Sequence, residues 1–208
     1  MKKNRFTICG IDEAGRGALA GPVVASAVVF PKSYRNEAIR DSKKLTPKAR
    51  EELAEIIKAK AIDWAIGIAT AEEITRLNIL RASLLAMERA FEKLTCVADE
   101  IIVDGIYRPN IVIQNKTILR AIPQADEKVL AVSAASILAK VERDRMMKEL
   151  QWEHFNFEFN RHKGYPTKKH LMELARFGPT KAHRLTFKPV SALMIQIGSS
   201  EGSDEEVY

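Results

Sequence analysis

Acidic side chains at the ends of two apolar segments are the residues whose types and spacing most readily support chemistry. Asp12 and Glu13 end the first apolar run of the chain, Asp104 ends the segment EIIVD, and Asp126 lies in the segment QADEK. If the two apolar segments are parallel neighbours in a sheet, their carboxyl ends bring the acids together. Unpaired carboxylates repel one another unless protons or divalent cations neutralise them, and oxygen-only ligation favours Mg²⁺ or Mn²⁺. Two such ions suit in-line displacement at a phosphate.

An ordinary interpretation of each acid stays open beside this metal-site hypothesis. Acids at strand ends are common in solvated turns, which are enriched in aspartate. Consecutive residues of a strand also point to opposite faces, so Asp12 and Glu13 can serve one site only if the strand ends or bulges there. The identity of the fourth acid is open as well, because Glu127 directly follows Asp126.

A glycine-rich segment, GRGALAGP, follows the first pair of acids. Gly15, Gly17 and Ala20 fit the G-x-G-x-x-G/A pattern of dinucleotide-binding proteins, which requires a helix to begin in the loop. Gly21-Pro22 and a β-branched run follow instead, so this pattern does not indicate a nucleotide cofactor. Because glycine has no Cβ, such a loop allows a ligand to approach the backbone closely.

Basic residues are unevenly distributed along the chain and favour a polyanionic partner. The formal net charge is +6, and residues 161–188 contain eight Lys or Arg against a single acid, Glu173. Such a density is typical of surfaces that bind nucleic acid, where each phosphate contact releases counterions. A basic face that is merely solvated is the alternative. Lys43 and Lys44 precede a predicted helix, where they either reach a phosphate or only add solubility.

Two other segments contain polar side chains whose roles the sequence bears on, and only the first has both a functional and a structural interpretation. Tyr165, in HKGYPT, is either a stacking platform for a sugar or base, or a packing residue of a turn. Arg143 shares a predicted helix with Lys140, Glu142 and Asp144, which indicates a mixed-charge face turned to solvent.

The rest of the sequence predicts the elements that position these residues. Apolar β-branched runs indicate strands, and amphipathic periodicity with caps such as Thr70–Glu73 indicates helices. Helices that crowd the end of the chain after a series of strands favour an α/β sheet with a helical C-terminal extension. Strands are expected at residues 5–11, 22–30, 61–70, 100–104 and 118–122, and helices at 47–60, 74–94, 133–150 and 168–177.

Cysteine usage and apolar run lengths bear on where the protein works. Cys9 and Cys96 are too few for a disulfide framework. The N-terminus lacks the apolar stretch of a signal peptide, and the longest near-apolar run, LAGPVVASAVVF, is too short to span a bilayer. We therefore expect a soluble, cytoplasmic protein without membrane contacts. A monomer is also expected, although the sequence itself does not give the oligomeric state.

Taken together, the segments GIDEAGRGALAGPVV, DSKKL, NIL, VDG, SAASILAK and HKGYPT resemble the type 2 ribonuclease H family, ribonuclease HII, and occur in its order. The resemblance implies a ribonuclease H-like fold, a mixed five-stranded sheet flanked by helices with a small helical C-terminal extension. It implies an endoribonuclease that hydrolyses the RNA strand of RNA–DNA hybrids and cuts 5′ of single ribonucleotides embedded in duplex DNA. Two Mg²⁺ or Mn²⁺ ions are the implied cofactors.

The resemblance also implies roles for individual residues. Four acids match the catalytic metal ligands, and the Gly-Arg-Gly loop matches the segment that recognises the ribose 2′-hydroxyl, largely through its backbone. The tyrosine matches the residue that stacks on the sugar at an RNA–DNA junction, and the two lysines lie where basic residues approach phosphates. The implied metal ligands are Asp12, Glu13, Asp104 and Asp126, and the implied substrate-binding residues are Gly15, Arg16, Gly17, Lys43, Lys44 and Tyr165.

Two rival functions compete with this interpretation. A nuclease of the same fold that cuts branched DNA is disfavoured by the Gly-Arg-Gly loop and Tyr165, because DNA has no 2′-hydroxyl to recognise. A binding module without catalysis is disfavoured by acids at strand ends in a protein that binds polyanions. We expect a catalytic α/β domain at residues 1–152, a basic helical extension at 153–198 and an acidic disordered tail at 199–208.

Overall fold

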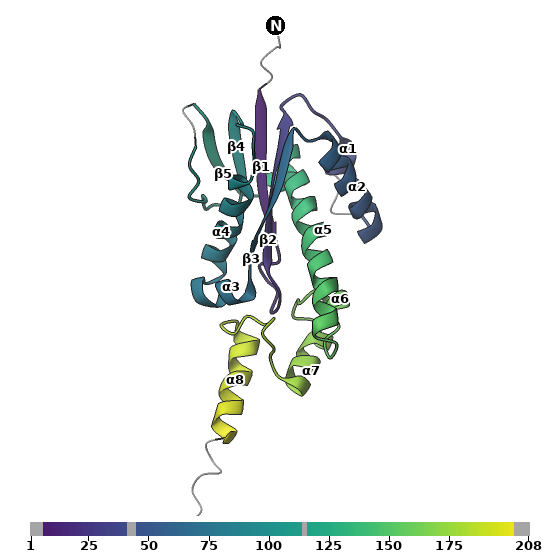
Figure 1. Ribbon diagram of the computed structural model, residues 1–208, viewed down its shortest axis with the longest axis vertical. Helices are drawn as coiled ribbons and strands as arrows, with labels where there is room; N and C mark the ends of the chain where they lie inside the picture. The colour runs from purple at the N-terminus through teal and green to yellow at the C-terminus, as the bar shows by residue number, and fades with distance from the viewer. Residues whose placement is uncertain (1–5, 41–44, 114–115, 202–208) are drawn as a thin grey trace, which may run out of the picture.

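A mixed sheet forms the centre of the protein, whose computed structural model describes residues 6–40, 45–113 and 116–201 (Figure 1). Its order is β3-β2-β1-β4-β5, with β1 antiparallel to β2 and parallel to β4. This arrangement confirms the predicted five-stranded mixed sheet. The strands are β1 (Thr7–Ala14), β2 (Val23–Pro31), β3 (Asp63–Ala69), β4 (Glu100–Asp104) and β5 (Ile118–Ile122).

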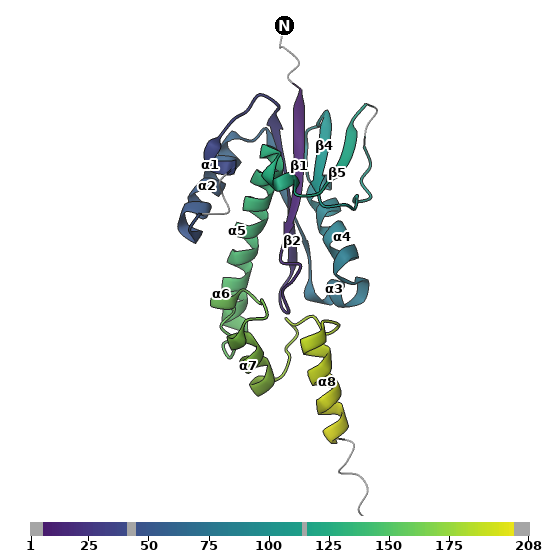
Figure 2. The same cartoon turned by 180° about the vertical axis from the view of Figure 1, so that it is seen from behind.

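Helices cover both faces of the sheet (Figures 1 and 2). On one face α5 (Leu130–Glu153) packs against β1 and β2, with α1 (Glu37–Arg40) and α2 (Pro47–Lys60) beside it. On the other face lie α3 (Ala71–Leu77) and α4 (Ile79–Glu92).

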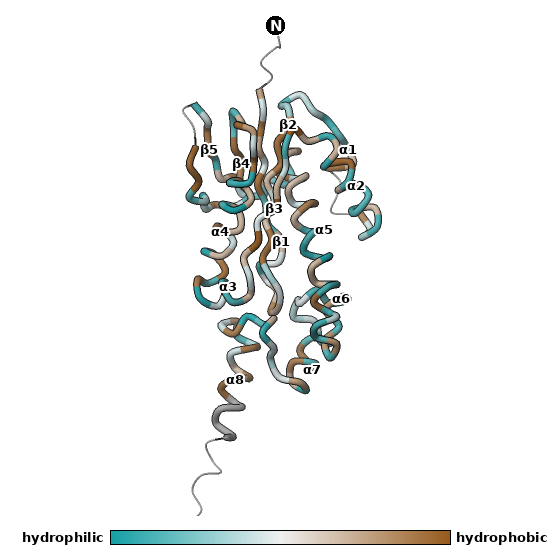
Figure 3. The backbone as a smooth tube through the Cα atoms, viewed as in Figure 1, coloured by the Kyte–Doolittle hydropathy of each residue, from teal (hydrophilic) through white to brown (hydrophobic). Residues whose placement is uncertain are grey.

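A strand that is covered on both faces needs apolar side chains at consecutive positions, which explains the near-continuous hydrophobic sequence of β2. Hydrophobic residues accordingly concentrate on the central strands, and polar ones on the outer helices and loops (Figure 3). Each fully buried Val, Ile or Phe side chain contributes roughly 1.5–3 kcal/mol to stability. The acidic ends of β1 and β4 are therefore held on a well-packed scaffold.

The C-terminal helices lie beyond the end of β1 (Figure 1). They are α6 (Phe159–His162), α7 (Lys168–Phe177) and α8 (Lys188–Glu201). A separate apolar cluster joins them to the rest of the molecule and includes Leu19, Met147, Phe157, Phe159 and Leu174. Because Leu19 belongs to the glycine-rich segment after β1, this cluster ties that segment to the extension.

Four features of the secondary structure differ from the prediction. β1 continues to Ala14, so Asp12 and Glu13 lie inside a strand that was expected to end at residue 11. The helix expected at 74–94 is two helices, because Asn78 adopts a φ of +68° and its side chain caps α4 by accepting from the amides of Leu80 and Arg81. The short elements α1, α6 and the 3₁₀ helix η2 (Ala125–Glu127) were not expected, since they span too few residues to show periodicity. The last helix, at Lys188–Glu201, was not among the expected helices, and it runs three residues into the expected disordered tail. Residues 202–208 of that tail lie outside the described residues.

Across the described part of the chain, no helix combines the length and the apolar character needed to cross a bilayer.

Candidate active site

The parallel pairing of β1 and β4 brings the predicted acids to one edge of the sheet. Ile11 lies opposite Val103, so Asp12 and Asp104 follow as neighbours at the carboxyl ends of the two strands. The amide of Ala125 donates to Asp104 Oδ1 at 2.7 Å, which places η2, and with it Asp126, at the same edge. The condition that the sequence left open, parallel neighbouring strands, is therefore met.

Glu13 lies near this group, and its pKa responds to the charge of Asp104. The register of β1 with β2 continues unbroken through Asp12↔Ser26 and Glu13↔Ala25, so β1 neither ends nor bulges at these two acids. β4 ends at Asp104, and the edge of β1 beyond this point has no pairing from β4. The Glu13 carboxylate can therefore approach that edge, where Arg16 Nη1 lies 3.2 Å from Glu13 Oε1.

Burial and mutual repulsion shape the electrostatics of the acids. Asp12 is only 6% exposed, and burial together with the charge of Glu13 raises its pKa well above the usual range. Hydrogen bonds from Ser136 on α5 and from the Glu13 amide, 2.7 Å from Oδ1, act in the opposite direction. Burial raises the pKa of Glu13 as well; Arg16 opposes this shift and the Asp104 charge adds to it. The charge of Asp104 thus acts on both Asp12 and Glu13, so the three carboxylates lie close together.

The donor chemistry of this site fits a hard divalent cation. The oxygens that it offers belong to carboxylates, and within the described residues the buried Glu13 Oε2 has no hydrogen-bond partner. A buried anionic oxygen without a donor is costly unless a cation or proton reaches it. Among the described residues, no three His, Cys, Asp or Glu side chains form a finished metal-binding group. The carboxylates lie at one edge of the sheet without forming such a group, and their side chains would have to move closer together to bind an ion.

Gly15 and Gly17, in the segment 15–22 that is called the glycine loop below, have different surroundings. Gly15 has a φ of +99°, and a Cβ added there would lie 2.0 Å from Nε of Arg143. A Cβ added at Gly17 would meet nothing within 4 Å. Gly15 therefore makes room for a side chain beneath the loop, whereas the side of Gly17 where a Cβ would project is open to an incoming molecule.

Tyr165 lies beside the glycine loop. The amide of Leu19 donates to the carbonyl of Gly164 at 2.7 Å, which joins the two segments. The Tyr165 carbonyl accepts a hydrogen bond from His170 Nδ1 at 3.0 Å. The guanidinium of Arg143 lies 5.2 Å from the centre of the Tyr165 ring, which is half-buried. The structure thus brings together the loop and the tyrosine that the sequence analysis singled out.

Two arginines at this place were not recognised from the sequence. Arg143 was expected on a solvent-facing surface and is instead fully buried, which corrects that prediction. The sequence does contain an indication of this burial, because the residues four positions to either side of Arg143, Ala139 and Met147, are apolar and share its face of the helix. Both are buried in the structure. Arg184 was counted only as part of the basic segment and is also fully buried.

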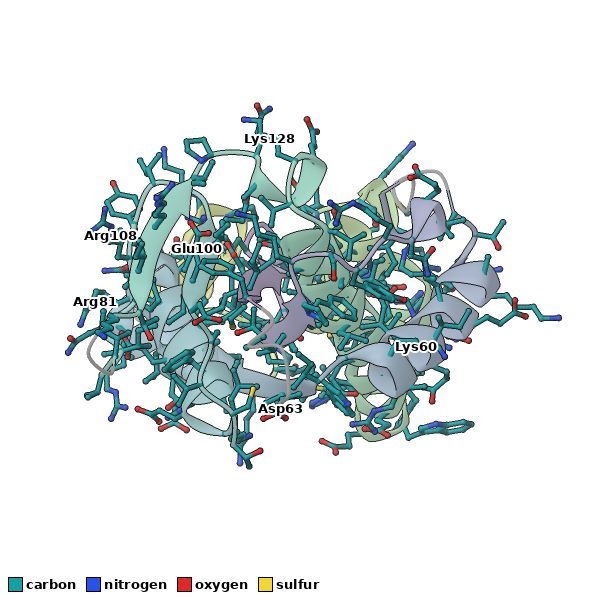
Figure 4. All side chains as sticks on the ribbon, turned by 90° about the horizontal axis from the view of Figure 1, so that it is seen from above. Lys60, Asp63, Arg81, Glu100, Arg108 and Lys128 are labelled. Atoms are coloured by element: carbon teal, nitrogen blue, oxygen red, sulfur yellow. The ribbon has the colours of Figure 1, made fainter. Side chains whose placement is uncertain are left out.

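The basic residues have mixed surroundings. Lys168 is exposed, but Lys169 Nζ lies 3.0 Å from Glu158 Oε1 and 3.6 Å from Glu173 Oε1, so its charge is partly compensated. Lys43 and Lys44 lie outside the described residues. Basic side chains also occur away from the extension, and a view from the end at which β1 begins shows Arg81, Arg108 and Lys128 at the periphery of the molecule (Figure 4).

The comparisons with known proteins agree with this geometry. A family model described as Ribonuclease HII matches residues 9–190. The chain is 47% identical to a ribonuclease HII of Nitrosococcus oceani over 183 residues, which cover 88% of this chain and 89% of the relative. It is also 47% identical to a ribonuclease HII of Coxiella burnetii over 194 residues, which cover 93% and 94% of the two chains.

A solved structure supports the same relationship. The crystal structure of the ribonuclease H2 from Pyrococcus horikoshii OT3 superposes with a TM-score of 0.76 at 25% sequence identity, and the match covers 93% of this chain and 99% of that one.

Proposed function

Because this chain belongs to the ribonuclease HII family, we propose that it hydrolyses the RNA strand of RNA–DNA hybrids and cuts duplex DNA on the 5′ side of single ribonucleotides. Family membership makes the chain a ribonuclease H endonuclease, and the choice of substrate is the proposal. The observation that carries it is the meeting of acids from β1 and β4 beside a glycine loop with an open side at Gly17.

The acids would hold two divalent cations, Mg²⁺ or Mn²⁺. The oxygen-only donor set, the unpartnered Glu13 Oε2 and the raised pKa values of Asp12 and Glu13 all support cation binding at this edge. When bound, such ions stabilise charge on a phosphate and lower the pKa of a water molecule. Asp126 is favoured over Glu127 as the fourth acid, because Asp126 is half-buried and Glu127 is exposed. The proposed ligands are Asp12, Glu13, Asp104 and Asp126.

Recognition of a single ribose would come from the glycine loop and Tyr165. The 2′-hydroxyl is the group that distinguishes RNA from DNA at one position. The open side of Gly17 would let a minor-groove sugar reach the backbone, and Tyr165 beside it would stack on the sugar. Arg16, whose side chain is 50% exposed and paired with Glu13, would lie between the sugar and the acids.

The C-terminal extension at residues 153–198 would supply contacts with phosphates that do not depend on sequence. Exposed basic residues such as Lys168 support this role, because such contacts strengthen binding to any duplex. Both cysteines, Cys9 and Cys96, are free thiols, which supports a cytoplasmic location. The monomeric state stays a prediction.

One incubation tests the proposal. Four labelled substrates are compared in buffer with and without Mg²⁺: a duplex with one ribonucleotide, an RNA–DNA hybrid, an all-DNA duplex and a branched DNA junction. We expect cleavage of the first two only, in Mg²⁺ only, with the ribonucleotide at the 5′ end of the downstream fragment. Cleavage of the junction would favour the alternative of a nuclease that cuts branched DNA, and binding without cleavage would favour a binding module.

A further inference from the structure

Two fully buried arginines meet beneath the glycine loop. Arg143 comes from α5 and Arg184 from the segment before α8, and neither forms an ion pair within the described residues. Burial lowers the pKa of both guanidinium groups, that of Arg184 to about 9, and the proximity of Arg143 adds to this shift. A buried cation without a carboxylate partner is costly, so its hydrogen bonds to the backbone have to compensate.

Arg143 joins the two segments proposed to recognise the ribose. Its Nε donates to the carbonyl of Pro22 at 3.0 Å and its Nη2 to that of Ala20 at 3.1 Å, both in the glycine loop. Its Nη1 donates to the carbonyl of Lys163 at 2.9 Å, two residues before Tyr165, whose ring also faces the guanidinium. A single side chain thus spans both segments.

Arg184 binds the same loop, and it shares the Pro22 carbonyl with Arg143. It donates through Nε to the Gly21 carbonyl at 3.0 Å and through Nη2 to the Pro22 carbonyl at 3.1 Å. Its Nη1 donates at 3.0 Å to the carbonyl of Arg16, which lies in the Gly-Arg-Gly turn itself. The planar guanidinium fork can reach three carbonyls at fixed angles, and a lysine ammonium cannot reproduce that geometry.

The bond to the Arg16 carbonyl determines how the next amide points. In a planar trans peptide the C=O and N–H groups point in opposite directions. Because Arg184 draws the Arg16 carbonyl inward, the Gly17 N–H is directed away from the buried guanidinium. Within the described residues this amide donates no hydrogen bond, and a Cβ added to Gly17 would meet nothing within 4 Å. The turn thus offers an oriented donor at a place where a hydroxyl oxygen can accept it.

We propose that Arg143 and Arg184 are positioning residues that hold the Gly17 amide and Tyr165 in the geometry that selects a ribose over a deoxyribose. This inference rests on the proposed function, because it assigns the structural basis of the same selection. The arginines do not touch the substrate; they act through the backbone carbonyls that they bind.

A binding measurement tests this role separately from folding. Arg184→Lys and Arg143→Lys are introduced into the Asp104→Asn protein, which is expected not to cleave. Affinities for a duplex with one ribonucleotide and for the matching all-DNA duplex are measured well below each variant's Tm. Each substitution is expected to reduce the preference for the ribonucleotide by about fivefold or more, the effect of one hydrogen bond. Affinity for all-DNA duplex should stay within about twofold, since the positive charge is kept.

Arg145→Lys is the matched control, because Arg145 lies on the same helix but is exposed and paired with Glu142 and Glu149. This control should leave the preference unchanged. A merely structural role would lower Tm and leave the preference of the folded variants intact, and that result for both lysine variants would overturn the inference. If the Asp104→Asn protein itself binds both duplexes equally, the proposed substrate is overturned, and this inference with it. If that protein prefers the duplex with one ribonucleotide and the preference survives both lysine substitutions, the inference alone is overturned.

Discussion

Replacing Gly15 by alanine should lower the stability of the protein strongly, whereas replacing Gly17, in the same turn, should leave its stability nearly unchanged. At Gly15 the added methyl group would lie 2.0 Å from Nε and 2.5 Å from Cδ of Arg143, closer than any real contact. The guanidinium would have to leave its place and lose hydrogen bonds to the carbonyls of Pro22, Ala20 and Lys163. The φ of +99° is itself strained for any residue with a Cβ.

The size of the Gly15→Ala effect follows from these contacts. Losing two of the three charged hydrogen bonds costs about 3–6 kcal/mol, and the backbone strain adds about 1–3 kcal/mol. The sum, about 4–9 kcal/mol, is a large part of the roughly 5–15 kcal/mol that stabilises a typical domain. At about 2–4 °C per kcal/mol for a chain of this size, Tm should fall by at least about 8 °C.

Gly17→Ala is the matched control. Its φ lies outside the left-handed region, and the added methyl group would meet nothing within 4 Å, so Tm should change by less than about 3 °C. Because this methyl group would stand on the side proposed for the sugar, cleavage at a single ribonucleotide should nevertheless fall. Thermal unfolding followed by circular dichroism, with cleavage assayed on the same preparations, separates the two effects. Equal Tm values for Gly15→Ala and the wild type would refute the packing of Arg143 beneath the turn.

Three other predictions follow from the site and its surroundings. Replacing Lys168 and Lys169 together by Gln should weaken binding to every duplex and reduce the salt dependence of the binding constant by a slope of about 1 per lost phosphate contact. Most of the change should come from Lys168, which has no carboxylate partner among the described residues. An unchanged slope would mean that this face is merely solvated. Tyr165→Ala should reduce cleavage at a lone ribonucleotide about 5- to 150-fold, and more than cleavage within a long hybrid; equal losses with a lowered Tm would indicate a packing role instead. Burial, with His170 adjacent, lowers the pKa of His183 to about 3, below its unfolded value of 6.5. The contribution of His183 to the free energy of unfolding should therefore be complete above about pH 6.5 and decrease toward pH 3 by up to about 1.4 kcal/mol per pH unit. Urea unfolding across this range measures the slope, and a His183→Gln variant with the same slope as the wild type would contradict this prediction.

Elements with a strong local signal could be predicted from the sequence alone. The Thr70–Glu73 capping box, the helix at Lys168–Phe177 and the strands at 100–104 and 118–122 are present as expected, because caps and periodicity depend on neighbouring residues. Asn78 shows the limit of this approach. Its apolar neighbours continue the helical stripe, and only its positive φ separates α3 from α4.

The site divides in the same way between local and distant information. The types of the acids and glycines indicated metal and backbone chemistry, but their meeting depends on a parallel pairing between strands separated by about ninety residues. Arg143 was misassigned because a charged residue on a mixed-charge helix is usually solvated, and its acceptors lie in distant segments. Buried polar groups whose partners are backbone carbonyls leave no complementary residue type for a sequence pattern to reveal.

Asp104→Asn tests most directly the central claim that the acids at the ends of β1 and β4 hold the ions for cleavage beside a ribonucleotide. The amide oxygen of Asn can still accept from the Ala125 amide, so the fold should be kept while a negative ligand is lost. A labelled duplex with one ribonucleotide is incubated with excess protein in Mg²⁺, and binding is measured in parallel. The wild type should give a single cut on the 5′ side of the ribonucleotide, and the variant should bind within about twofold and give no product. Substantial cleavage by the Asn variant in Mg²⁺ would contradict the account.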